Sequence, residues 1–234
     1  MVKQLRVWDL PTRLFHWALF VLVAGSITTI KLGGNWVDWH FRCGYAILTL
    51  LLFRVVWGFA GTRYARFSEM IATWARIQSA LRDFFKTGRS MSAGHNPLGS
   101  LSVLAMLCAL LVQATTGLFS KDDVSDEGPL AVYVSNSASE WISSVHSANA
   151  VVIYILLGLH VIAIAFYYWR KGMNLVGPMI SGSMRVPEEG PALAENTAAI
   201  QEGWRLWVRA ALVLAACAAA VWVVVSRKPA AIGG

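Results

Sequence analysis

Five long apolar stretches, separated by polar segments, make up most of the chain. They cover residues 14–30, 40–60, 98–119, 141–169 and 206–226. A helix that crosses a bilayer needs about 20 mostly apolar residues, and each stretch reaches or nearly reaches that length. The pattern predicts an all-α membrane protein, in which a four-helix transmembrane bundle is followed by an additional C-terminal transmembrane helix.

The polar segments predict the domain limits. The first four stretches are expected to form one transmembrane domain, residues 1–180. Residues 181–205, which are rich in Pro, Glu and Ala, are expected to be a cytoplasmic linker, and residues 206–234 the C-terminal transmembrane helix and tail. Residues 64–85 carry apolar side chains at helical spacing with basic residues between them, which predicts an amphipathic helix on the inner surface. The first stretch lacks a clear cleavage site, so we expect a retained helix rather than a signal peptide.

Composition and charge agree with a membrane protein. Hydrophobic residues make up 56% of the chain and charged residues 14%, whereas soluble domains average about 45–50% and about 25%. Basic residues gather before the first stretch, after the second and after the fourth, and acidic residues follow the third. The positive-inside rule therefore places the N-terminus in the cytoplasm, although Arg227 and Lys228 go against it. The net charge of +7 reflects this topology and not a nucleic-acid partner.

The three cysteines exclude several kinds of metal centre. Cys43, Cys108 and Cys217 are far apart, and no Cys-x-x-Cys motif occurs. An iron–sulfur cluster, a zinc ribbon and a covalently attached c-type haem are therefore not expected. Each cysteine is interpreted as a small buried apolar side chain.

Histidines in the apolar stretches are the main candidates for chemistry, because ionisable side chains inside a membrane are costly and usually functional. His146 and His160 are fourteen residues apart. In a helix this spacing puts both on one face, about 21 Å apart along the axis. Two sites stacked across one membrane have this geometry.

The predicted topology gives each of these histidines a partner. His16 lies near the inner face, level with His160, and His40 lies near the outer face, level with His146. Two histidines on facing helices hold a haem iron from both sides, and no Cys or carboxylate is placed to complete a zinc or copper site. Haem with two axial histidines has no open position for oxygen, so the pattern favours electron transfer.

Four further residues are candidates for functional roles. Arg54, fourteen residues after His40, is expected level with the inner haem, where a propionate needs a cation. Arg42 either serves the outer haem in the same way or extends to the membrane interface. Gly44, one turn from His40, either leaves room for a flat macrocycle or allows close helix packing. His95 is either a quinone-binding or protonating residue at the inner surface or an interfacial side chain.

Several motifs, taken in order, resemble one family over roughly residues 5–180. The first helix carries Val7-Trp8-Asp9-Leu10-Pro11-Thr12-Arg13-Leu14-Phe15-His16-Trp17, and the second His40-Phe41-Arg42-Cys43-Gly44 and Phe53-Arg54. The third carries Gly94-His95-Asn96-Pro97-Leu98-Gly99 and Gln113-Ala114-Thr115-Thr116-Gly117, and the fourth His146 and Gly158-Leu159-His160. The chain resembles the bacterial di-haem cytochrome b-561 family, which is related to the cytochrome b subunit of nickel–iron hydrogenases.

The resemblance implies two haems b in the bacterial inner (cytoplasmic) membrane, with His16, His40, His146 and His160 as axial ligands, and electron exchange with a membrane quinone. Relatives differ in their other partner, which is a hydrogenase or another oxidoreductase subunit, a soluble c-type cytochrome, or oxygen species. The basic inner face near His95 and Arg54 is the expected quinone region. The acidic segment 122–127 either docks a basic cytochrome c or is a solvated loop.

The leading hypothesis is thus a di-haem cytochrome b that moves electrons between a quinone pool and a redox partner, alone or as part of a quinone oxidoreductase. The alternative from another class is a haem-free membrane transporter or anchor that uses its histidines for protons or metal.

Overall fold

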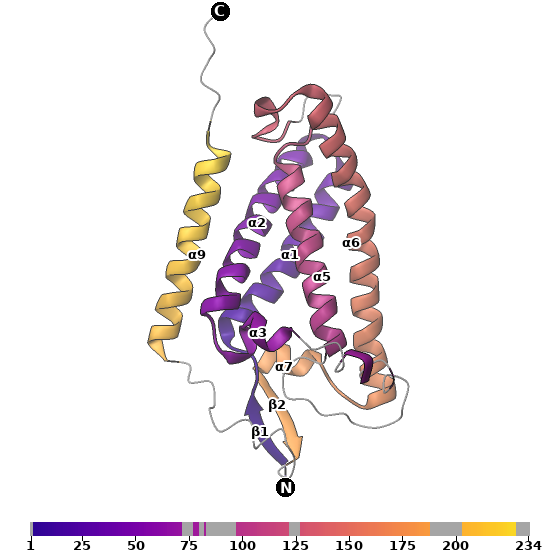
Figure 1. The fold of residues 1–234 in the computed structure, drawn as a ribbon, viewed down its shortest axis with the longest axis vertical. Coiled ribbons are helices and arrows are strands. Elements are labelled where there is room, and N and C mark those ends of the chain that lie inside the picture. The colour runs from indigo at the N-terminus through magenta and orange to yellow at the C-terminus, as the bar shows by residue number, and fades with distance from the viewer. Residues whose placement is uncertain are drawn as a thin grey trace, which may run out of the picture. The chain divides into compact units, whose positions relative to one another are not determined.

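The computed structural model describes residues 2–71, 77–79, 82, 97–121, 127–187 and 203–227. In this part of the chain, five helices are long and apolar enough to cross a membrane. They are α1 (Leu10–Leu32), α2 (Val37–Ala60), α5 (Pro97–Gly117), α6 (Asn136–Lys171) and α9 (Trp204–Val225) (Figure 1). The predicted class, a mainly helical membrane protein with five membrane-spanning helices, is confirmed.

Two of these helices begin before their apolar stretches because a polar residue caps them. The carboxylate of Asp9 accepts a hydrogen bond from the backbone N–H of Thr12 at 2.7 Å, which lets α1 start at Leu10. The hydroxyl of Ser135 accepts from the N–H of Ala138 at 3.3 Å, at the start of α6. Side-chain acceptors of this kind satisfy the first N–H groups of a helix, so the two helices extend beyond the residues that hydrophobicity predicts.

The chain divides into two compact units that share the long helices. The first unit contains Met1–Phe15, Val55–Met106 and Leu156–Ala210. The second unit contains His16–Arg54, Leu107–Ile155 and Ala211–Gly234. Each is described separately below.

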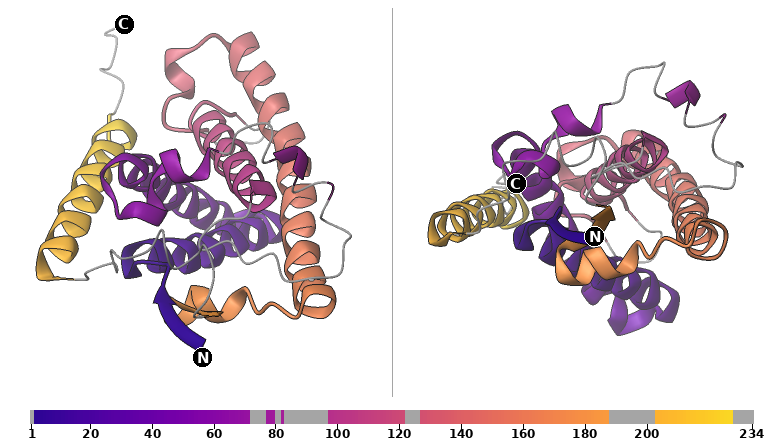
Figure 2. Two further views of the ribbon diagram at one scale, coloured as in Figure 1. Left: turned by 60° about the horizontal axis from the view of Figure 1, so that its bottom comes forward. Right: turned by 90° about the horizontal axis from the view of Figure 1, so that it is seen from below.

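A two-stranded ribbon in the first unit was not predicted. Strand β1 (Val2–Arg6) pairs antiparallel with β2 (Ser183–Pro187), which follows the short helix α7 (Val176–Ser181). Figure 2 shows the indigo β1 beside the orange segment that carries α7 and β2. Gly182 joins α7 to β2 with a φ of +84°, a left-handed conformation that favours glycine. Residues 183–187, expected at the start of a linker, therefore form a strand.

A buried carboxylate organises the helices of the first unit. Asp9 is 1% exposed, and Trp57 of α2 is fully buried. Besides capping α1, Asp9 accepts hydrogen bonds from the indole N–H of Trp57 at 3.3 Å and from the hydroxyl of Thr62. Arg13 donates to the backbone carbonyl of Ile180. These contacts explain why Asp9 and Arg13 occur in the first motif of the sequence.

In the second unit, α9 contributes to an apolar core. Leu48 of α2, Leu118 at the end of α5 and Val221 of α9 are buried together. The last helix is thus packed against the helices that precede it. Of the other expected elements, the amphipathic helix over residues 64–85 lies partly outside the described residues, which include the short helices η2 (Arg63–Ala65) and α3 (Phe67–Met70).

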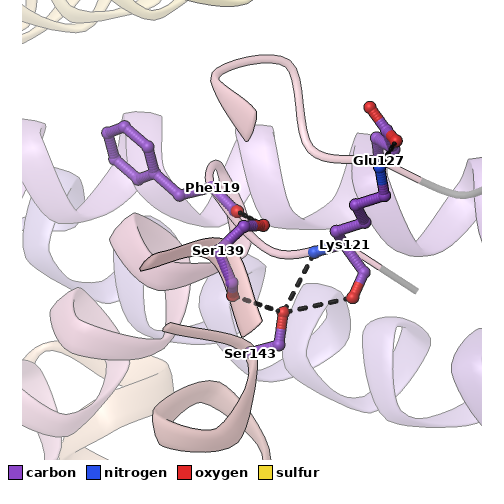
Figure 3. Close-up of polar contacts among 5 residues, drawn as sticks. All are labelled: Phe119, Lys121, Glu127, Ser139 and Ser143. Atoms are coloured by element: carbon purple, nitrogen blue, oxygen red, sulfur yellow. Dashed lines mark hydrogen bonds and ion pairs between the residues drawn. The ribbon is translucent and has the colours of Figure 1, made fainter. Parts of the chain in front are cut away.

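Serine side chains hold the segment that follows α5 (Figure 3). The hydroxyl of Ser139 donates to the carbonyl of Phe119 at 2.8 Å, and that of Ser143 accepts from the N–H of Lys121 at 3.0 Å. The Lys121 ammonium forms an ion pair with Glu127 at 2.6 Å. Non-helical backbone near a membrane needs such partners, because lipid offers none. The rest of the acidic segment 122–127 lies outside the described residues.

Candidate functional site

The second unit contains a cavity of about 560 Å³. Its walls come from α1, α2, α5 and α6, and they are mainly apolar. Binding sites for small molecules and cofactors are mostly apolar cavities of about 300–1,000 Å³ with a few well-placed polar groups. Two of the polar groups in this cavity are the imidazoles of His40 and His146.

The two imidazoles lie at a distance that suits one metal ion between them. Their ring centroids are 6.4 Å apart, and the ring planes make an angle of 86°. Imidazole nitrogens bind a metal at about 2.0–2.1 Å, and each nitrogen is about 1.1 Å from its ring centroid, so a bridging metal separates the centroids by about 6.3 Å. The observed spacing therefore fits haem iron with two axial histidines.

Ser26 of α1 orients His40. The Nδ1 atom of His40 is 3.0 Å from the carbonyl oxygen of Ser26 and 3.0 Å from its hydroxyl. A carbonyl only accepts, so Nδ1 carries the proton, and Nε2 keeps its lone pair for a metal. Metal-binding histidines are typically held in this way through the nitrogen that does not bind the metal.

His146 is held by two residues of α5. Its Nδ1 lies 3.1 Å from the hydroxyl of Thr116, and its Nε2 lies 3.0 Å from the amide nitrogen of Gln113. A β-carbon at Gly117 would be only 3.1 Å from Cε1 of this ring, so the imidazole lies directly against the end of α5. With the Gln113 amide turned away, Nε2 of His146 would be available to a metal.

The wall of the cavity is open beside His40. Gly44 lines the cavity, and no atom of the described residues lies within 4 Å of a β-carbon built there. The space next to this glycine is therefore available to a flat ring. Close helix packing, the other interpretation of Gly44, is not what the structure has at this position.

Two cationic side chains of the second unit line a cavity or groove. Lys121 lines the histidine cavity. Arg42 stacks over the ring of Trp39 at 4.8 Å and lines a separate groove of about 450 Å³ with Trp222 of α9. Its proposed contact with a propionate stays a prediction.

The other predicted site residues are placed individually. His16 lies in α1 within the second unit, and His160 lies in α6 within the first, so their pairing stays a prediction from the sequence. Arg54 is 3% exposed in α2. His95 lies outside the described residues.

Sequence reasoning assigned no role to Ser26, Gln113, Thr116 or Lys121. The motif from Gln113 to Gly117 contributed only to the family resemblance, although its polar residues inside an apolar helix were a signal of function. Among the residues that the structure describes, no group of three or more His, Cys, Asp or Glu side chains is arranged to hold a metal ion. A haem needs only two axial ligands from the protein, because its macrocycle supplies the other four nitrogens.

Known proteins that resemble this chain are b-type cytochromes. Residues 7–182 match the family model described as prokaryotic cytochrome b561. The chain is 21% identical over 227 residues to a probable Ni/Fe-hydrogenase 1 B-type cytochrome subunit of Escherichia coli strain K12, covering 82% of this chain and 85% of that protein. The subunit of the same name in Escherichia coli O157:H7 matches with the same figures. No solved structure matches significantly.

The chain belongs to the prokaryotic cytochrome b561 family, whose model covers most of its length. It is therefore a multi-pass bacterial membrane protein and a b-type cytochrome that acts in electron transfer. The cofactor that this family implies is haem b, and the cavity between His40 and His146 has the volume and the ligand spacing to hold one.

Proposed function

We propose that the protein is a di-haem cytochrome b that carries electrons across the bacterial inner membrane, between a membrane quinone and a redox partner. The observation that carries the proposal is the pair His40 and His146, whose rings face one cavity with their centroids 6.4 Å apart. The bound haem supplies a one-electron iron centre. The chain supplies the ligands, the apolar surroundings and the position.

The first haem lies between His40 and His146. Ser26 holds the proton of His40 on Nδ1, so Nε2 would offer its lone pair to the haem iron. Gly44 leaves space for the macrocycle. Lys121 lines the same cavity and offers a cation to a propionate in exchange for its ion pair with Glu127.

The second haem is proposed between His16 and His160 on the sequence spacing. His146 and His160 belong to one uninterrupted helix, α6. Arg54 follows His40 by fourteen residues, the same step as from His146 to His160, and it serves a propionate of this haem in the proposal. His95 belongs to the proposed quinone region on the inner, cytoplasmic side, where the N-terminus also lies.

The redox partner is proposed from the relatives. The matched Escherichia coli proteins are named as probable B-type cytochrome subunits of a Ni/Fe-hydrogenase. A membrane or peripheral oxidoreductase of this kind is the leading partner for the present chain. A c-type cytochrome that docks on the acidic segment 122–127 is the second candidate.

A reduced-minus-oxidised spectrum of the purified full-length protein tests the proposal. We expect α-band absorption of haem b and two haems per chain. His40→Ala and His146→Ala each remove the same haem, and His16→Ala and His160→Ala each remove the other. Ser144→Ala is the control, because this exposed hydroxyl of α6 bonds only to the carbonyl of Glu140 among the described contacts, and both haems remain.

Two results would contradict the proposal. A protein that binds no haem b and copurifies with no iron is not a cytochrome, and a transporter or anchor then becomes the better explanation. If His40→Ala and His146→Ala removed different haems, the ligand pairing would be wrong.

A further inference from the structure

The hydrogen bonds around His146 form a chain whose direction can be assigned. At one end, the side-chain amide of Asn149 lies 2.9 Å from the backbone carbonyl of Ala109. A carbonyl only accepts, so the atom facing it is the amide nitrogen of Asn149. The same nitrogen donates to the amide oxygen of Gln113 at 2.7 Å. The other amide atom of Gln113, its NH₂ group, therefore faces the imidazole.

This direction fixes the protonation of the His146 ring. The NH₂ group of Gln113 donates to Nε2 of His146 at 3.0 Å, because an amide nitrogen has no lone pair to offer. In a neutral imidazole the proton is then on Nδ1, which donates to the hydroxyl of Thr116 at 3.1 Å. The hydroxyl of Thr116 in turn donates a hydrogen bond to the carbonyl of Val112 at 2.7 Å. This series of hydrogen bonds thus ends on backbone carbonyls of α5 at both ends.

The neutral tautomer that results, with its proton on Nδ1, is the one that binds iron through Nε2. A metal takes the lone pair of one ring nitrogen, and a hydrogen bond from the other nitrogen sets the ring orientation and the strength of the ligand. His40 has the same form, with Nδ1–H donating to Ser26. In both imidazoles Nδ1–H therefore donates a hydrogen bond, to a carbonyl in His40 and to a hydroxyl in His146.

We infer that Thr116 and Gln113 are positioning residues for the haem between His40 and His146, with opposite roles. Thr116 keeps Nε2 of His146 available and fixes the ring plane. Gln113 satisfies the Nε2 lone pair in the haem-free protein and gives it up when iron binds. This inference rests on the proposed function, since it needs a haem in the cavity.

Two properties of the structure make Gln113 suited to a temporary contact. Its amide oxygen is already held by Asn149, so the side chain has a second anchor when it leaves the ring. It also lines the cavity, so the released NH₂ group faces the bound cofactor and not lipid. Thr116 has no such alternative, because its hydroxyl proton is committed to the backbone of α5.

Thr116→Val tests the first role. Valine keeps the shape and removes the acceptor for Nδ1–H. We expect the affinity for hemin of the full-length haem-free protein to fall by about 10-fold or more, as is typical when an outer-shell partner of a metal-binding histidine is lost. In the haem-loaded protein, the midpoint potential of the haem that His40→Ala removes should rise, because a less basic axial ligand stabilises ferric iron less. Its low-spin ferric EPR signal, which depends on the angle between the ligand planes, should broaden or shift.

The neighbouring threonine is a matched control. Thr115 makes the same kind of bond to its own helix, to the carbonyls of Leu111 and Val112, but it is exposed and contacts no histidine in the described contacts. Thr115→Val should leave hemin affinity, potential and EPR signal unchanged. If Thr116→Val behaved like Thr115→Val, the role of Thr116 would be refuted, while the proposed function would stand as long as the unmodified protein binds two haems.

Gln113→Leu tests the second role and has the opposite sign. Removing the group that competes for Nε2 should raise hemin affinity by about 2- to 10-fold, the range expected for one net hydrogen bond. The potential and the EPR signal of the loaded protein should stay close to those of the unmodified protein. If Gln113→Leu lost the haem instead, Gln113 would be a permanent support and the inference would be wrong.

Discussion

Polar side chains with several hydrogen-bond partners occur in both units, but their surroundings differ. In the first unit, the carboxylate of Asp9 accepts hydrogen bonds from Thr12, Trp57 and Thr62. These residues line neither the cavity of His40 and His146 nor the groove beside Arg42. In the second unit, His40 and His146 are hydrogen-bonded at Nδ1 to Ser26 and Thr116, and both line a cavity of about 560 Å³.

The difference separates a structural polar cluster from a binding site. A carboxylate surrounded by fixed donors ties helix ends together and has no capacity left for a ligand. A pair of imidazoles oriented through Nδ1, with Nε2 atoms that can turn to a shared cavity, retains capacity for a metal. Polarity and hydrogen bonding alone do not distinguish the two, whereas the direction of the remaining lone pairs does.

The largest expected effect comes from filling the cavity. Gly44→Leu places a branched side chain in the open space beside His40. We expect the haem content to fall from two per chain to one, with the helical circular dichroism unchanged, because no existing contact is removed. Ala46→Leu is the control, since Ala46 lies on the same helix but lines the other groove. Full haem content in Gly44→Leu would place the haem elsewhere.

A smaller effect is expected from removing Asp9, the shared hydrogen-bond acceptor of the polar cluster in the first unit. Asp9→Ala removes the acceptor of three hydrogen bonds and leaves the buried indole N–H of Trp57 without it. Since each unsatisfied buried donor costs about 1–3 kcal/mol, the free energy of unfolding should fall by about 3 kcal/mol. The haem spectrum of the protein that remains folded should keep its shape. Denaturant unfolding in mild detergent measures the change.

The matched variant for this experiment is Asp38→Ala, which removes an exposed carboxylate from the first turn of α2. Its effect on unfolding should stay within about 0.5–1 kcal/mol. An Asp9→Ala protein as stable as Asp38→Ala would show that the Asp9 cluster contributes little to stability.

The smallest effect is expected from a single methyl group at the cavity wall. In Gly117→Ala, the new β-carbon would lie 3.1 Å from Cε1 of His146, so the ring must shift by a few tenths of an ångström. Both haems should remain, and only the potential and EPR signal of one should change. In Gly25→Ala the new contact, with Sγ of Cys43, is an ordinary 3.5 Å, and no change is expected. Equal spectra for the two variants would mean that His146 does not lie against Gly117.

Much of the fold follows from hydrophobicity, and the exceptions have local causes. The apolar stretches predict all five membrane-spanning helices, because lipid requires long continuous apolar helices. The extra turns of α1 and α6 depend on the caps Asp9 and Ser135, which hydrophobicity does not report. The ribbon pairs residues 2–6 with 183–187. Because the two strands are so far apart along the chain, no turn motif in the sequence predicts their pairing.

The sequence predicted that His40 and His146 lie together, but not which residues hold them. Helical spacing and topology put His40 and His146 at the same depth, and the structure places both rings at one cavity. Ser26, Gln113 and Thr116 could not be identified in that way. Serine and threonine in membrane helices commonly bond to their own backbone, as Thr115 does. Only the positions of neighbouring helices reveal which hydroxyl also meets a histidine.

The hydrogen bonds of the two imidazoles bear on how the protein is assembled. His40 is held by α1, the helix immediately before its own, and His146 by α5, the helix immediately before its own. Each histidine therefore belongs to a helical hairpin that is contiguous in the chain, and its hydrogen bonds can form as soon as that hairpin has entered the membrane. During synthesis, the hairpin of His40 is complete before the hairpin of His146 has been translated. Under the proposed function, the haem then joins two hairpins that have already formed, and it binds only after the second hairpin has been inserted.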